Sequence, residues 1–95
     1  MLKIKNNIDL KRLEDFGFRP KYNVDTGKIE KYIKEYTYYG FDANRDYIAI
    51  SVEKSEWQEG QYNTVEFWQL YLEKATEKSI DLLYDLIISG IVEKM

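Results

Sequence analysis

The chain has 95 residues, of which 44% are hydrophobic and 33% charged, with a net charge of -3 at neutral pH. This length fits one domain covering residues 1–95, and the composition is typical of a globular protein. The sequence contains neither Cys nor His, which excludes disulfides, thiolate or imidazole metal sites and nucleophiles of the Cys-His or Ser-His kind. It also lacks the glycine-rich motifs of nucleotide-binding enzymes. We therefore expect a protein that is not an enzyme and holds no metal or cofactor.

Charge is distributed unevenly along the chain. The first 50 residues carry ten basic and eight acidic side chains, whereas the remaining 45 carry four and nine. Such asymmetry is usual for a solvated surface, and the functional alternative is a surface that docks a charged partner. No apolar run reaches the roughly 18 residues of a membrane helix, and the N-terminus lacks the pattern of a signal peptide. We expect a cytoplasmic protein with no membrane partner.

The first predicted element is a short helix from Asp9 to Phe16. Asp9 is a favourable N-cap, and Gly17 can adopt the left-handed conformation that ends a helix. Phe18 stands where an apolar residue commonly folds back on the helix, and Pro20 prevents its continuation.

The middle of the chain predicts antiparallel strands. A hairpin is expected from Phe18 to Val24 and on to Tyr39, around the turn Asp25–Lys28. Its second arm, Lys31 to Tyr39, also fits a helix face, but its β-branched and aromatic residues favour a strand. Three more segments follow the hairpin. They are a turn at Gly40–Asp46, a strand at Tyr47–Val52 and a polar loop at Ser55–Tyr62.

The strongest predicted strand runs from Thr64 to Leu72. Phe67 lies on one of its faces and Trp68 and Leu70 on the other, so both faces are apolar. A strand of this kind is expected in the middle of a sheet that is covered on both sides. Two helices, one of them short, are thin cover for two faces. We therefore expect self-association or a persistent apolar docking surface.

A second helix is predicted from Ser79, as N-cap, to Ser89, before Gly90. Its apolar residues surround most of the helix, which indicates packing on two sides or cover by another chain. Asp81 and Asp85 lie one turn apart, and we interpret them as a solvated edge and not as a catalytic pair.

The segments Ile8–Phe18 and Ile80–Lys94 resemble the two ends of small uncharacterised proteins encoded in phages and prophages of AT-rich Gram-positive bacteria. The resemblance implies an accessory protein of a mobile element and implies no site residue. Frequent Lys, Ile, Tyr and Asn agree with an AT-rich genome.

Together these patterns predict an α+β fold, with a three- or four-stranded antiparallel sheet, a short N-terminal helix and a longer C-terminal helix. The predicted function is a non-catalytic protein-interaction module whose partner is another protein or a second copy in a homo-oligomer. The alternative is a nucleic-acid-binding sheet with exposed aromatic residues, which the net acidity disfavours. Hot spots favour Trp and Tyr, although packing in the core is the simpler interpretation of Trp68 and Tyr84. The candidate partner-binding residues are Trp57, Trp68, Tyr84, Tyr36 and Tyr38.

Overall fold

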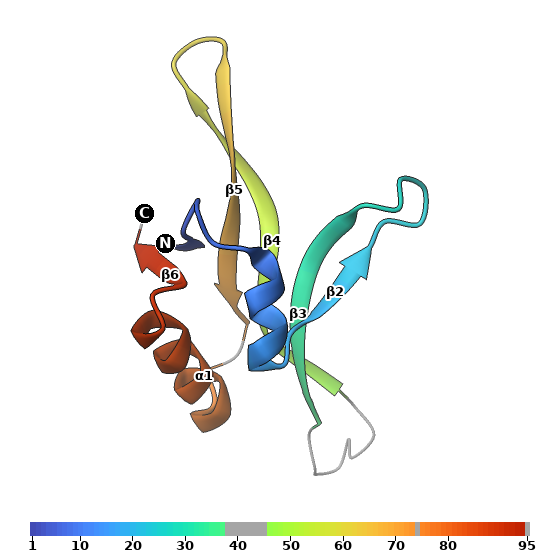
Figure 1. Cartoon of the computed structure of the whole chain (residues 1–95), viewed down its shortest axis with the longest axis vertical. Helices are drawn as coiled ribbons and strands as arrows, with labels where there is room; N and C mark the ends of the chain where they lie inside the picture. Colours follow the sequence, from blue (N-terminus) through green and yellow to red (C-terminus); the bar gives the residue numbers. More distant parts are fainter. Residues whose placement is uncertain (38–45, 74, 95) are drawn as a thin grey trace.

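The computed structural model describes residues 1–37, 46–73 and 75–94, and it describes the side chains of these residues except for 35–37 and 46–49. The fold is α+β, with an antiparallel sheet, one 3₁₀ helix and one α-helix (Figure 1). In chain order the elements are β1 Leu2–Ile4, η1 Leu10–Phe16, β2 Arg19–Tyr22, β3 Ile29–Thr37, β4 Asp46–Glu59, β5 Asn63–Leu72, α1 Glu77–Ile88 and β6 Val92–Lys94.

The sheet has six strands in the order β2-β3-β4-β5-β1-β6, so the prediction of three or four strands was wrong. The two extra strands are the chain ends, β1 and β6. Leu2 pairs with Leu70 of β5 and with Lys94 of β6, which brings both ends of the chain onto one side of the sheet. Each of these strands has three residues, which is too short for a period-two pattern to be recognised. Their pairing depends on partners that are distant in sequence.

The segment predicted as a polar loop from Ser55 to Tyr62 is largely strand. β4 continues to Glu59, and its pairing with β5 extends from Ile50 opposite Leu72 to Glu59 opposite Asn63. This β4–β5 arm projects beyond the other strands as a two-stranded ribbon (Figure 1). Most of its side chains are exposed. A ribbon with water on both sides needs no hydrophobic alternation, and this explains the wrong prediction.

The N-terminal helix forms where it was predicted, but it is a 3₁₀ helix and not an α-helix. The Asp9 carboxylate accepts a hydrogen bond from the Lys11 backbone N–H at 3.0 Å. Gly17 adopts φ 91°, and the Phe18 N–H donates to the Leu13 carbonyl at 3.2 Å. The cap residues were therefore predicted correctly. The tighter helix fits a segment of two turns whose Leu13 is its one fully buried side chain.

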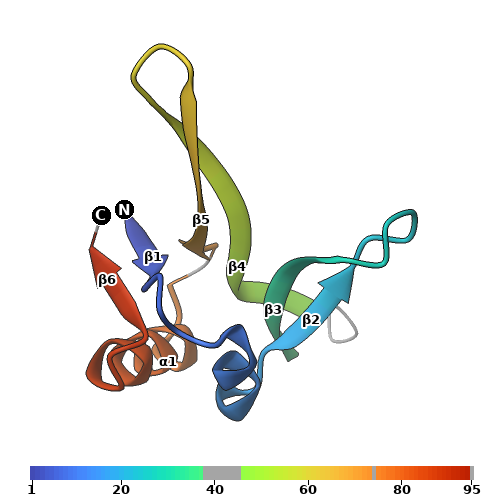
Figure 2. The same ribbon diagram turned by 45° about the horizontal axis from the view of Figure 1, so that its top comes forward.

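Both helices pack on the same face of the curved sheet (Figure 2). β5 is an interior strand as predicted, between β4 and β1, but its two faces are not covered by one helix each. Trp68 faces the helices and meets Tyr32 edge to face, with ring centroids 5.9 Å apart. The main core lies between this face and the helices. Its buried members are Ile4, Leu13, Phe18, Tyr32, Ile50, Val52, Leu70, Leu82, Leu86, Ile91 and Val92.

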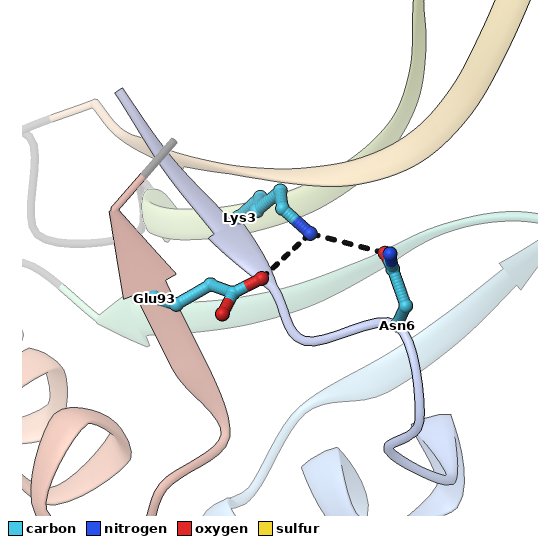
Figure 3. A network of polar contacts seen from close by, with 3 residues as sticks. All are labelled: Lys3, Asn6 and Glu93. Carbon is cyan, nitrogen blue, oxygen red and sulfur yellow. Dashed lines mark hydrogen bonds and ion pairs between the residues drawn. The ribbon is translucent and has the colours of Figure 1, made fainter.

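The opposite face of the sheet is crossed by a row of polar residues. Residues paired across neighbouring strands share a face, and the pairing places one polar side chain on every strand. Lys31 lies 3.6 Å from Glu53, and the Lys3 ammonium lies 2.7 Å from Glu93 and donates to Asn6 at 3.0 Å (Figure 3). The charges of this row therefore pair with one another at the surface, whereas Ile33 and Phe67 on the same face are buried. From β2 to β6 the row comprises Lys21, Lys31, Glu53, Gln69, Lys3 and Glu93.

Candidate functional site: an exposed apolar stripe on the C-terminal helix

The C-terminal helix α1, Glu77–Ile88, begins three residues earlier than predicted. Its N-cap is Thr76, and Ser79, predicted as the cap, instead lies in the first turn. The Ser79 N–H donates to the Thr76 hydroxyl at 3.2 Å, and the Thr76 N–H donates to the Ser79 hydroxyl at 2.8 Å. This reciprocal capping box satisfies backbone donors that would otherwise have no partner in the helix. At the other end, the Ile91 N–H donates a hydrogen bond to the Leu86 carbonyl at 3.1 Å, and Gly90 adopts the left-handed conformation. This geometry fixes the path of the chain from α1 into β6.

One side of α1 faces the core. Its buried residues are Ser79, Leu82 and Leu86, and Leu83 is partly buried beside them. These positions recur at helical spacing, so a single side of the cylinder contacts the sheet. Because Ser79 contributes little apolar surface, Leu82 and Leu86 provide most of the attachment of the helix. The rest of the cylinder is available to solvent.

The outward side of α1 carries an apolar stripe, which we call the α1 stripe. Its members follow the i, i+4, i+7, i+8 pattern and lie on one side of the helix. Their exposed fractions are 52% for Ile80, 62% for Tyr84, 49% for Ile87 and 65% for Ile88. Together they expose roughly 450 Å² of largely apolar surface, on the scale of the largest patch of a typical monomer. Four large apolar residues adjoining on one helix differ from the scattered exposed residues that are normal on protein surfaces.

One edge of the α1 stripe is acidic. Glu77, Asp81 and Asp85 are exposed and follow one another at intervals of four residues along the helix. Because successive residues are about 100° apart around a helix, Asp81 and Asp85 lie next to Ile88, just outside the stripe. Lys78 is the single base in the sequence of this helix, and helical periodicity places it beyond the acids, on the side away from the stripe. No basic residue occupies the last turn. At the negative end of the helix dipole, the nearby cation is the Lys5 ammonium, which approaches Gly90 from the segment after β1.

The structure separates the predicted partner-binding residues. Trp68 belongs to the core side of the sheet, where it contacts Tyr32. Tyr84 lies in the α1 stripe. Trp57 lies on the β4–β5 arm opposite Val65 and is 48% exposed. The arm and α1 extend toward opposite ends of the molecule (Figure 1), so Trp57 and Tyr84 do not form one site.

The remaining two candidates cannot be assigned to a surface. Tyr36 belongs to β3, where its backbone pairs with Tyr47 of β4, but its side chain lies outside the described set. Tyr38 and the predicted turn at residues 40–46 lie outside the described residues, apart from Asp46 at the start of β4.

A small cleft lies between the N-terminal segment and β5. It has a volume of about 300 Å³ and is lined by Ile4, Lys5, Asn6, Ile8, Leu10, Glu66, Phe67 and Trp68. This volume is at the lower limit for small-molecule sites. Lys5 and Glu66 are the charged groups in its lining.

Within the described ranges, no three Asp or Glu residues gather in a way that could hold a metal ion. The same part of the chain has no helix with the length and hydrophobicity needed to span a bilayer. In the polar row of the sheet, Lys31 is paired with Glu53 and Lys3 with Glu93. This described face is therefore not a uniformly cationic surface of the type that binds a phosphate backbone.

Sequence reasoning found the apolar character of α1 but did not determine which side is exposed. Ile80, Tyr84 and Ile87 form a regular stripe in the sequence, and a regular stripe usually faces the core. The structure instead buries Leu82 and Leu86. The side of α1 that is buried includes Ser79, and because successive residues are about 100° apart around a helix, its burial turns the neighbouring Ile80 outward.

Comparison with family models, with curated proteins and with solved structures finds no match for this chain.

Proposed function

We propose that this protein is a non-catalytic protein-interaction module that binds its partner through the α1 stripe. The observation that carries the proposal is the simultaneous exposure of Ile80, Tyr84, Ile87 and Ile88 on one side of a helix whose other side is anchored in the core.

Physical chemistry supports a binding role for these residues. Exposed Ile is not favoured for helix formation, because its β-branched side chain loses rotamer freedom. Burying apolar surface yields about 25 cal/mol per Å², so covering the stripe would release a substantial free energy. Tyr84 adds a large, rigid side chain with a polar end, which is the type that dominates interface energetics. The stripe therefore combines apolar area with one aromatic anchor.

The partner's origin is proposed from the resemblance of the two chain ends to phage-encoded proteins, which suggests a protein of a phage or of its bacterial host. The proposal does not use Trp68, which packs in the core. Trp57 on the β4–β5 arm remains a separate candidate contact.

Site-specific photo-crosslinking tests the proposal. Benzoylphenylalanine is introduced at Tyr84 and, as the matched control, at Tyr22, a Tyr of similar exposure (60%) on the edge strand β2. A third variant carries the crosslinker at Trp57. In cells that naturally carry the gene, we expect a discrete protein adduct from position 84 and none from position 22. Equal adducts at both positions, or an adduct from position 57 alone, would contradict a site on α1.

A further inference from the structure

The acidic edge of the α1 stripe specifies the kind of partner that fits it. We propose that the occupant is an amphipathic helix of a different protein, with Lys or Arg along the edge of its apolar side. This inference rests on the proposed function and adds the chemistry of the partner. It depends on the placement of Asp81 and Asp85 beside Tyr84 and Ile88.

The size of the stripe fits a helix. From Ile80 to Ile88 the stripe is about 12 Å long at 1.5 Å per residue, or little more than two turns. Its exposed area of roughly 450 Å² is well below the 800 Å² per partner of a standard interface. A narrow ridge of this kind fits between the side-chain ridges of another helix.

The charges favour a basic partner. Asp81 and Asp85 border the stripe on one side. A partner with Lys or Arg at its rim would neutralise these two carboxylates as it covers the apolar residues. Complementary charges at a rim chiefly set specificity and association rate.

A second copy of this chain does not supply those bases. In a symmetric antiparallel pair of α1 helices, the edge with Asp81 and Asp85 meets the same edge of the other copy, which is repulsive. In a symmetric parallel pair, that edge meets the side of Leu83, which carries no base. A bilayer with anionic lipids is disfavoured for the same reason, since interfacial helices normally carry Lys or Arg on their polar side.

Fluorescence anisotropy with designed peptides tests this inference. Two labelled 18-residue amphipathic helices share one Leu and Ile stripe and differ only at its rim, where one has Lys and the other Glu. We expect the Lys peptide to bind the full chain at least ten-fold more tightly, with a smaller ratio at 300 mM than at 30 mM salt because of screening. The D81K/D85K variant should reverse the preference.

Two control variants separate charge from apolar contact. D25K/E59K makes the same charge change at the β2–β3 and β4–β5 turns, away from α1 (Figure 1), and it should retain the preference for the Lys peptide. I80S/I88S retains both acids and should lose at least ten-fold in affinity for that peptide. If it binds as tightly as the natural sequence, the contact is unspecific charge attraction and the inference is overturned.

The remaining outcomes distinguish this inference from the proposed function. Equal affinity for the two peptides would overturn the basic-partner inference while supporting an apolar docking site. Binding of neither peptide would overturn the inference, and the crosslinking at position 84 then decides the proposed function independently. Binding to phosphatidylcholine and phosphatidylglycerol vesicles that I80S/I88S abolishes, or a dimer in sedimentation that the same variant abolishes, would assign the stripe to a lipid surface or to a second copy.

Discussion

Replacing Leu86 with Ala is expected to destabilise the protein strongly, because this side chain is fully buried between α1 and the sheet. Three buried carbon atoms at about 0.8 kcal/mol each give a transfer contribution of about 2.4 kcal/mol. The residual cavity raises the expected loss to about 3 kcal/mol. A domain of this size is stable by only about 5–14 kcal/mol, so the loss is a large fraction of the total. The melting temperature should fall by about 15 °C.

The matched control is Ile88→Ala on the outward side of the same helix. Ile88 is 65% exposed, so its truncation loses only about one third of the transfer free energy, or about 0.8 kcal/mol. The higher helix propensity of Ala offsets about half of that loss. Urea unfolding followed by circular dichroism should therefore show a change below about 0.5 kcal/mol. Equal losses for the two variants would refute the orientation of α1, and a loss at Ile88 that grows with protein concentration would show that a second copy covers the stripe.

Three further predictions concern the cap, the core and the arm. Thr76→Ala removes one half of the capping box and should cost about 1 kcal/mol in urea unfolding, whereas Thr76→Ser should be nearly neutral. Burial raises the pKa of Tyr32 above its ordinary value of 10.0. The unfolded chain then loses the Tyr32 proton at a lower pH than the folded chain does. The free energy of unfolding is therefore unaffected below about pH 10 and falls as the pH rises toward the folded pKa. Unfolding measured from about pH 9 to about pH 11.5 should show a shallower fall for Tyr32→Phe than for the natural sequence. Replacing residues 57–65 with Asn-Gly shortens the arm, removes no member of the main core, and should change the free energy of unfolding by less than about 1 kcal/mol; a larger loss would mean that the arm supports the core.

Elements whose signals are local were predicted well. Asp9 and Gly17 cap η1 as their side-chain chemistry requires, and Gly90 ends α1 in the left-handed conformation. The pairing around the Asp25–Lys28 turn was also predicted, since turn residues and strand-forming residues adjoin there. β3 is a strand from Ile29 to Thr37, which resolves the helix alternative as far as Thr37.

Elements that depend on distant partners were not predicted. β1 and β6 exist because the two chain ends pair with each other and with β5. The strand in the arm exists because β4 and β5 continue to pair with each other beyond the core. Neither arrangement leaves a periodic hydrophobic pattern in the sequence, because β1 and β6 are too short and the strands of the arm have water on both sides.

By itself, the amino-acid sequence determined the α+β class, both caps of η1, the end of α1 at Gly90, the interior position of β5 and the excess of apolar surface on the C-terminal helix. These properties follow from residue chemistry and from contacts between near neighbours. Only the tertiary structure decided that both helices share one face of the sheet and that Leu82 and Leu86, and not Ile80 and Ile87, face the core. A helix that is apolar on most of its circumference can pack in several rotations with similar burial. The choice among them depends on Ser79 and Ile91, which the cap and β6 fix against the sheet.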